Sequence, residues 1–271
     1  MQNLHFRYFY TCNDIEHKMD DLIPLNIALV SYYNTLPFLH GLKGSGRWNR
    51  SEFILLPPSG CLEVFKNNEA DIALVPVGAL STLEDYKIIS DYCIGCDGDV
   101  LTVGLFANKP VGQVKFVYLD QDSRTSAILV KVLLEEYFKV NPIFLTNLPN
   151  QLDDLGDDEG VLMIGDKVFR HGKSFKYAYD LGRYWKEHTG LPFVFAVWIA
   201  KKAMPESIIT EFNKALKHGL DLIPEIVKSL KNDSIDLASY YKENISFELT
   251  FDKIQGMNLY LEKTKKYLPQ S

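Results

Sequence analysis

An apolar run that stops at a polar turn and then continues as an amphipathic helix limits what this chain of 271 residues can fold into. Residues 114–119 read Val-Lys-Phe-Val-Tyr-Leu, and residues 120–126 read Asp-Gln-Asp-Ser-Arg-Thr-Ser. Apolar side chains then recur at helical spacing up to Asn141-Pro142, namely Ile128, Leu129, Val132, Leu133 and Tyr137. The pattern predicts a strand, a tight turn and a helix in succession.

The start of this predicted helix suits an anion. Its first backbone N–H groups have no partner inside the helix, and the helix dipole adds positive potential there. Three hydroxyls and a guanidinium stand at this point and fit a carboxylate, namely Ser123, Arg124, Thr125 and Ser126. The alternative is that Asp122 or Ser123 only caps the helix, while the remaining hydroxyls face solvent. The pattern alone leaves both interpretations open.

Short apolar runs alternate with helical patterns along most of the chain. The predicted strands are residues 25–30, 53–56, 71–75, 143–145, 161–164 and 191–200. Residues 86–94 and 100–106 are two further extended runs, and Asp97-Gly98-Asp99 is the expected turn between them. Strands that alternate with helices predict an α/β fold with a mostly parallel sheet whose faces are covered.

Polar residues follow several of these strands, where open α/β sheets place their ligands. They occur at residues 31–35, 75–78, 96–99, 123–126 and 165–166. Three of these strand ends belong to one expected lobe and two to the other, which predicts a ligand cleft between the lobes. The alternative is that Ser31 and Asn34 only satisfy loop backbone and that Asp166 only caps a turn.

We expect three segments in the domain organisation. Residues 1–23 have neither a helical nor a strand period and are predicted to be an N-terminal extension, in which Met19 is an alternative start. Residues 24–107 together with 198–271 are expected to form lobe 1, and residues 108–197 to form lobe 2.

Composition and charge argue against several partners and locations. The net charge is −6 and the chain has no basic tract, so nucleic acid is not an expected partner. Residues 1–23 carry charges throughout and lack the apolar core of a signal peptide. No later stretch approaches the ~18 uninterrupted apolar residues of a membrane span. We therefore expect a cytoplasmic protein that does not engage a membrane, and the oligomeric state stays open.

Six motifs in order resemble the MqnA family, the chorismate dehydratases of the futalosine route to menaquinone. The similarity runs from about Leu25 to the C-terminus. The motifs lie at residues 30–37, 71–77, 91–95, 119–126, 164–166 and 189–198. The resemblance implies a type II periplasmic-binding-protein fold and the conversion of chorismate to 3-[(1-carboxyvinyl)oxy]benzoate with loss of water. It implies no metal and no organic cofactor.

The resemblance also gives the candidate residues their expected roles. Ser123, Arg124, Thr125 and Ser126 are expected to bind one carboxylate of chorismate. Gly98 and Asp166, at two other strand ends, complete the expected binding residues.

Asn34 and Ser31 are the expected catalytic residues, and Asn34 is expected to hydrogen-bond to the leaving hydroxyl. No clear general base is present, because the 6 histidines fall outside the motifs. A carboxylate of the substrate itself is therefore expected to take the proton.

Three other functions remain as alternatives. The sister enzyme that makes 1,4-dihydroxy-6-naphthoate shares the fold, but that family carries a Ser-Pro-Cys-Pro-Asn-Asp type of first loop, unlike residues 31–35 here. A non-catalytic binding protein for small acids is a second alternative, for which an export signal is missing from the pattern. A ligand-sensing regulatory domain is the third, for which no basic helix-turn-helix segment is visible.

Overall fold

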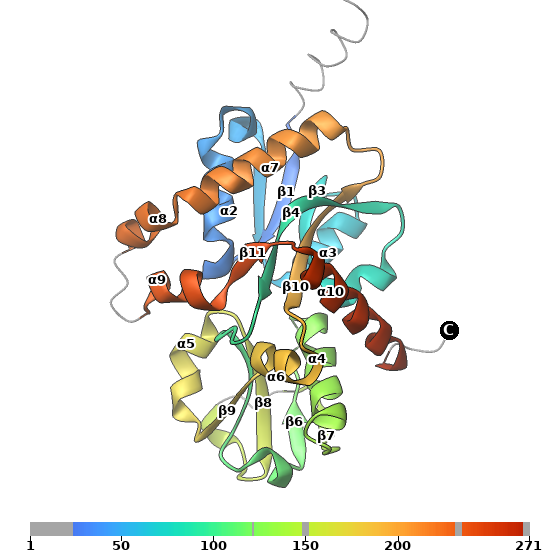
Figure 1. Cartoon of the computed structure of the whole chain (residues 1–271), viewed down its shortest axis with the longest axis vertical. Coiled ribbons are helices and arrows are strands. Elements are labelled where there is room, and N and C mark those ends of the chain that lie inside the picture. Colours follow the sequence, from blue (N-terminus) through green and yellow to red (C-terminus); the bar gives the residue numbers. More distant parts are fainter. Residues whose placement is uncertain (1–23, 121, 148–151, 231–234, 268–271) are drawn as a thin grey trace, which may run out of the picture.

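The computed structural model describes residues 24–120, 122–147, 152–230 and 235–267. Within these ranges, no helix is both long enough and apolar enough to cross a membrane. The predicted N-terminal extension, residues 1–23, lies outside the described residues. The chain forms two lobes, one above the other in Figure 1.

Lobe 1 is built on a six-stranded sheet with the order β11-β4-β10-β3-β1-β2. Its strands are β1 (Asn26–Val30), β2 (Glu52–Leu56), β3 (Ile72–Pro76), β4 (Tyr86–Cys96), β10 (Phe193–Lys201) and β11 (Ser246–Glu248). β1 pairs in parallel with β2 and β3, whereas β10 runs antiparallel to β3 and β4. β3 is buried along its whole length, as expected for a central strand that is covered on both faces.

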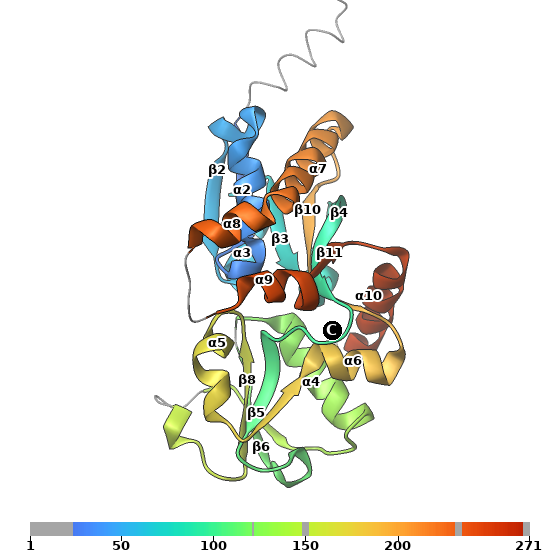
Figure 2. The same ribbon diagram turned by 60° about the vertical axis from the view of Figure 1, so that its left-hand side comes forward.

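Helices cover this sheet on both sides (Figure 2). They are α2 (Leu36–Gly44), α3 (Pro58–Lys66), α7 (Glu206–Asp221), α8 (Ile223–Leu230), α9 (Leu237–Ser239) and α10 (Phe251–Thr264). Short helical turns join them, namely η1 (Tyr33–Thr35), η2 (Gly46–Arg50), η3 (Val77–Thr82), η7 (Tyr240–Asn244) and η8 (Lys265–Tyr267). α2 and α7 cross backbone to backbone at Gly41 and Gly219, where a Cβ on Gly219 would lie 1.9 Å from the Pro37 carbonyl oxygen. Only glycine allows this crossing.

Lobe 2 is built on a five-stranded sheet with the order β7-β6-β8-β5-β9. Its strands are β5 (Val103–Ala107), β6 (Phe116–Tyr118), β7 (Ile143–Leu145), β8 (Glu159–Ile164) and β9 (Tyr177–Asp180). Its helices and turns are α4 (Arg124–Glu136), α5 (Lys167–His171), α6 (Leu181–Thr189), η4 (Val111–Gln113), η5 (Leu152–Asp154) and η6 (Gly172–Ser174). The strand, turn and helix predicted from residue 114 onward are present as β6 and α4.

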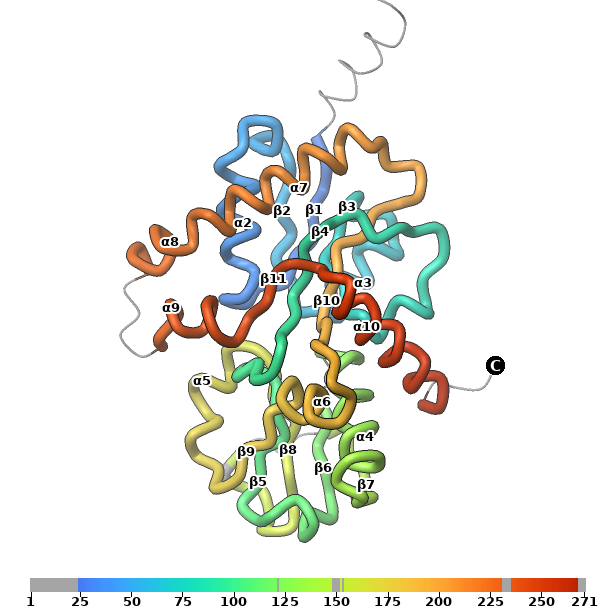
Figure 3. Tube along the Cα trace, in the orientation of Figure 1, coloured from blue at the N-terminus to red at the C-terminus, as the bar shows by residue number. Residues whose placement is uncertain are grey.

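The chain passes between the lobes earlier than the sequence suggested. β5 pairs with β8 and β9 of lobe 2, so the predicted end of the first part of lobe 1 at residue 107 lies one strand too late. β10 enters the lobe 1 sheet at Phe193, ahead of the predicted boundary at residue 197. Both crossings can be followed in Figure 3.

The expected hairpin of residues 86–94 and 100–106 is also wrong, because its two strands lie in different sheets. The connecting residues are held instead by Asp180, whose carboxylate accepts hydrogen bonds from the Val100 and Leu101 N–H groups. An apolar run with a polar break looks the same in a hairpin and in a crossing, so local pattern could not separate them.

Thr125 at the start of α4 joins the lobes. Its hydroxyl donates to the Phe195 carbonyl at 3.3 Å and accepts from the Gly78 N–H at 3.0 Å. Its own carbonyl accepts from the Tyr260 hydroxyl of α10 at 3.0 Å. Thr125 is fully buried, so water cannot replace these hydrogen bonds without opening the contact.

Replacing Thr125 by valine tests this junction. The methyl groups preserve the shape, but the buried Gly78 N–H loses its acceptor. We expect the free energy of unfolding to fall by about 1–3 kcal/mol and Tm to fall by roughly 2–12 °C. Thermal unfolding followed by circular dichroism measures this. Thr210→Val, on the exposed face of α7, is the matched control and should stay near wild type; equal Tm values for both variants would contradict the role of Thr125.

Candidate functional site

A cavity lies between the two lobes where the strands of both sheets end. Its space is about 510 Å³, including the part that opens to solvent. Lobe 1 lines it with Val30, Tyr32, Asn34, Pro58, Pro76, Ile94, Phe195 and Ala196. Lobe 2 and the crossing segment line it with Val100, Thr102, Val103, Ser123, Ser126, Ile164 and Gly165. The walls are mainly apolar with a few hydroxyl and amide groups, which is typical of a site for a small organic ligand.

The start of α4 brings two of its four candidate residues to the cavity. Ser123 caps the helix, since its Oγ accepts from the Ser126 N–H at 3.2 Å and donates to the Ser126 Oγ at 3.0 Å. The Ser126 hydroxyl therefore keeps its own proton for a further acceptor. Thr125 is committed to the lobe junction, and Arg124 is exposed and does not line the cavity. Ser123 therefore caps the helix, which was one alternative for this helix start, and it also lines the cavity.

An ion pair with a buried carboxylate lies in the turn before this helix. Asp120 is 3% exposed and pairs with the ammonium group of Lys167. The same carboxylate accepts from the Asp122 N–H at 3.0 Å, which shapes the turn before α4. Lys167 thus offsets a negative charge that would otherwise repel an acidic ligand at this end of the cavity.

Tyr32 is a cavity residue that the sequence analysis did not select. Burial raises its pKa, and the negative charges of Asp120, Asp122 and Asp166 raise it further. The phenol therefore remains protonated at neutral pH and can donate a hydrogen bond into the cavity. Gly165 makes room for it, because a Cβ there would lie 2.6 Å from the Tyr32 ring.

The turn η1 places Asn34 at the cavity, whereas Ser31, which precedes η1, lies outside it. Ser31 is exposed and is absent from the residues that line the cavity. The Asn34 Oδ1 atom is buried and has no hydrogen-bond partner among the described residues. A buried acceptor without a partner is costly unless a ligand or water completes it. Asn34 is therefore the cavity residue most clearly prepared for a polar ligand group.

Asp166 supports η1 from the opposite lobe. Its carboxylate oxygens accept from the Tyr33 N–H at 3.2 and 3.3 Å. Burial raises the pKa of Asp166 from 3.8 to about 6, while the Tyr33 N–H and the charge of Arg170 act in the opposite direction. Asp166 does not line the cavity, and neither does Gly98, which lies in the crossing segment between β4 and β5 with a φ of 115°. The structure thus gives Asp166 a place in the contact between the lobes.

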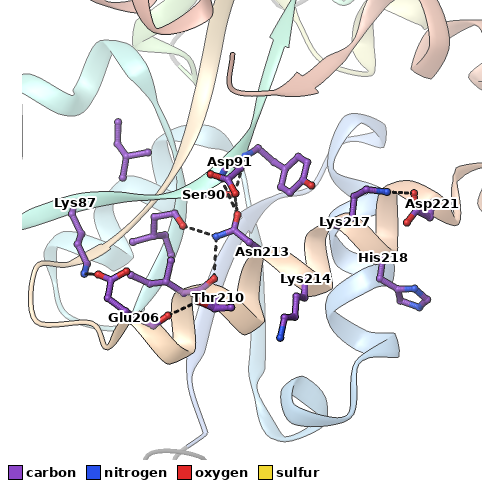
Figure 4. Close-up of a pocket in the computed structure, with 14 residues that line it drawn as sticks. Lys87, Ser90, Asp91, Glu206, Thr210, Asn213, Lys214, Lys217, His218 and Asp221 are labelled. Carbon is purple, nitrogen blue, oxygen red and sulfur yellow. Dashed lines mark hydrogen bonds and ion pairs between the residues drawn. The ribbon is translucent and has the colours of Figure 1, made fainter. Parts of the chain in front are cut away.

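A larger groove lies on the outer side of lobe 1, between β4 and α7 (Figure 4). Its lysines already have carboxylate partners, since Lys87 pairs with Glu206 and Lys217 pairs with Asp221. The Asn213 side chain accepts from the Asp91 N–H at 2.9 Å and donates to the Ile89 carbonyl at 2.8 Å. These two hydrogen bonds satisfy backbone groups of β4 that a neighbouring strand would otherwise pair with. We therefore place the functional site in the cavity between the lobes.

A hydrogen bond between two residues that are far apart in the sequence, Thr102 and Tyr240, lies at the site. Thr102, just before β5, lines the cavity and bonds to the buried hydroxyl of Tyr240 in η7. No local pattern marks Tyr240, which is 138 residues away from Thr102 in the chain. Within the described ranges, no three His, Cys, Asp or Glu side chains are grouped so that they could hold a metal ion.

Comparisons with known proteins agree with this architecture. The family model described as menaquinone biosynthesis matches residues 25–266. A chorismate dehydratase from Thermus thermophilus is 25% identical over 226 residues, which cover 76% of this chain and 81% of that protein.

Among solved structures, a protein from Archaeoglobus fulgidus aligns with a TM-score of 0.71 at 13% identity, covering 90% of this chain and 97% of the other. A Candida albicans protein described as having the generic periplasmic binding protein fold aligns with a TM-score of 0.63 at 16% identity, covering 92% of each chain. These two structures show the fold, and they confirm the predicted periplasmic-binding-protein-like architecture.

Asp166→Asn tests the raised pKa of this carboxyl. A carboxyl whose pKa is higher in the folded protein contributes stability below pH 3.8, and this contribution is lost as the pH rises through about 6. The variant cannot ionise, so its Tm relative to wild type should rise between pH 4 and pH 7.5. After allowance for solvent screening we expect about 1 kcal/mol, or roughly 2–4 °C.

Asp157→Asn is the control for this comparison, because Asp157 is an exposed carboxyl in lobe 2. Thermal scans of both variants and wild type in matched buffers make the measurement. A Tm difference between Asp166→Asn and wild type that stays constant over this pH range would show that Asp166 is not destabilised in its charged form.

Proposed function

We propose that the chain is a chorismate dehydratase. It belongs to the menaquinone biosynthesis family, whose model matches residues 25–266. The observation that carries this proposal is the similarity to the Thermus thermophilus chorismate dehydratase, which extends over both lobes. The reaction removes water from chorismate and leaves 3-[(1-carboxyvinyl)oxy]benzoate. We place this reaction in the cytoplasm, as the composition suggested.

The residues that line the cavity support this proposal. Chorismate has a ring carboxylate and an enolpyruvyl carboxylate. The start of α4 offers one of them the Ser126 hydroxyl in the positive field of the helix dipole. Ile94, Ile164 and Phe195 form apolar walls for the ring between the lobes. Arg124, exposed at the first residue of α4, contributes its charge at longer range.

The proposed reaction is an elimination that the ring itself favours. A proton leaves the ring carbon that bears the enolpyruvyl ether, and the neighbouring hydroxyl leaves with its bonding electrons. These two groups make the water, and the ring becomes aromatic. Asn34 orients the leaving hydroxyl by accepting its hydrogen bond through Oδ1. A carboxylate of the substrate takes the proton, and the protein fixes the conformation in which it can do so.

The protonated phenol of Tyr32 adds a hydrogen-bond donor to the same space. A donor that is already in place stabilises negative charge as it develops, without the cost of reorienting water. We assign Tyr32 to the stabilisation of the substrate oxygen atoms in this mainly apolar cavity.

Purified protein incubated with chorismate tests the function and the role of Asn34 together. The wild type should convert the ring diene to an aromatic product, seen by ultraviolet absorbance and identified by mass spectrometry. Asn34→Ala removes the acceptor that positions the leaving hydroxyl, so kcat should fall on the order of 100-fold. KM should change less, because the carboxylate contacts remain.

Asn67→Ala is the matched control, since Asn67 lies on the exposed end of α3 and should leave kcat unchanged. Binding of chorismate without turnover would favour the non-catalytic acid-binding protein instead. An unchanged kcat in a folded Asn34→Ala protein would remove Asn34 from the mechanism and keep the proposed activity.

A further inference from the structure

The turn η1, which carries Asn34, is held by both lobes, and the inference drawn from this rests on the proposed function. The Tyr33 N–H donates to the two carboxylate oxygens of Asp166 in lobe 2, at 3.2 and 3.3 Å. The Tyr33 carbonyl accepts from the hydroxyl of Tyr241, in η7 of lobe 1, at 2.6 Å. The peptide group that joins Tyr33 to Asn34 is thus fixed from lobe 1, and the peptide group before it is fixed from lobe 2.

The segment of lobe 2 that contains Asp166 also contacts the side chains next to Asn34. Phe169 of α5 packs on the Tyr33 ring, with ring centroids 6.4 Å apart at an angle of 65°. Gly165 lies so close to Tyr32, the residue before η1, that a Cβ would be 2.6 Å from its ring. Lobe 2 therefore meets this turn by apolar packing on both sides of Asp166, and the Asp166 carboxylate bonds to the backbone of the turn.

The other end of η1 is fixed within lobe 1. The Thr35 hydroxyl is bonded to the Val30 carbonyl of β1 and to the Tyr32 carbonyl at 2.9 Å. The Thr35 N–H also donates to the Tyr32 carbonyl, at 3.1 Å. Asn34 lies between this end and Tyr33, and its side chain is short. A shift of the Tyr33 backbone would therefore move the Asn34 Oδ1 atom with it.

The position of this atom matters for the proposed reaction. The Asn34 Oδ1 atom is a buried acceptor without a hydrogen-bond partner among the described residues, and it is proposed to accept from the leaving hydroxyl. A hydrogen bond tolerates only a narrow range of distances and angles. A displacement of about 1 Å at a reacting group can lower a rate on the order of 100-fold. A contact that fixes η1 can thus control kcat without touching the substrate.

We propose that Asp166 is a positioning residue, which fixes η1 through the Tyr33 N–H and thereby places the Asn34 Oδ1 atom at the leaving hydroxyl of the substrate. Asp166 does not line the cavity, so it acts through Tyr33. Because Asp166 follows β8 of lobe 2 and Asn34 follows β1 of lobe 1, Asn34 is correctly placed only while the lobes are together. This arrangement couples the elimination to closure of the lobes.

Steady-state kinetics of two Asp166 variants provide the first test. Asp166→Ala loses a hydrogen bond to a charged group, so kcat should fall about tenfold. KM should change less, because the Ser126 contact with the substrate remains. Asp166→Asn keeps an oxygen that can accept from the Tyr33 N–H and should restore kcat to within about threefold of wild type. Asp157→Ala, at an exposed carboxyl of lobe 2, is the control and should match wild type.

Two kinetic results would overturn the proposal. One is an Asp166→Asn protein as slow as Asp166→Ala, because the hydrogen bond to the Tyr33 N–H would then not be what matters. The other is an Asp166→Ala protein with a lowered Tm and an unchanged kcat, because Asp166 would then serve stability alone.

A double-mutant cycle tests whether Asp166 acts through Asn34. If it does, Asp166→Ala should cost clearly less kcat in an Asn34→Ala background than in wild type. The same tenfold loss in both backgrounds would contradict this role.

Nuclear magnetic resonance tests the same inference without turnover. The Asn34 side-chain amide signals of nitrogen-15-labelled protein are identified by their loss in Asn34→Ala. They should shift in Asp166→Ala and stay near their wild-type positions in Asp166→Asn and in Asp157→Ala. Unchanged signals in Asp166→Ala would overturn the positioning role. If the wild type does not convert chorismate, the proposed function fails, and these spectra still decide whether Asp166 places Asn34.

Discussion

The buried hydrogen bonds between the lobes are the constraint on which the rest of the structure depends. Thr125 joins α4 to the Gly78 N–H and the Phe195 carbonyl, and this junction fixes the start of α4 against lobe 1. The same placement brings Ser126 to the cavity that Asn34 also lines. Thr125 thus holds the start of α4, which carries Ser126, against lobe 1.

The electrostatics of the cavity follow from this closure. Burial raises the pKa of Tyr32, so its phenol remains a hydrogen-bond donor. Burial also raises the pKa of Asp166, so the charged form of this carboxyl destabilises the folded protein. Lys167 offsets the charge of Asp120 beneath α4. A mainly apolar space with few oriented polar groups suits a reaction in which the substrate supplies its own base, because the protein then has to control geometry more than proton transfer.

The sequence predicted the α/β class, the two lobes and the strand, turn and helix at α4, because these depend on local periodicity and on turn residues. It placed the crossings at residues 107 and 197, since pairing partners cannot be read from a single strand. Ser123, Ser126 and Asn34 were predicted and line the cavity, whereas Ser31, Arg124, Gly98 and Asp166 do not. Thr102 and Tyr240 could not be predicted, because their contact joins distant parts of the chain.

Calorimetric titration with 3-[(1-carboxyvinyl)oxy]benzoate most directly tests the claim that a carboxylate of the acidic ring is held by Ser126 at the start of α4. The account predicts one binding site per chain. It also predicts an affinity about tenfold lower in Ser126→Ala, which loses a hydrogen bond to a charged group. Ser229→Ala, in α8 away from the cavity, should bind as wild type does. Wild-type affinity in Ser126→Ala would contradict the account.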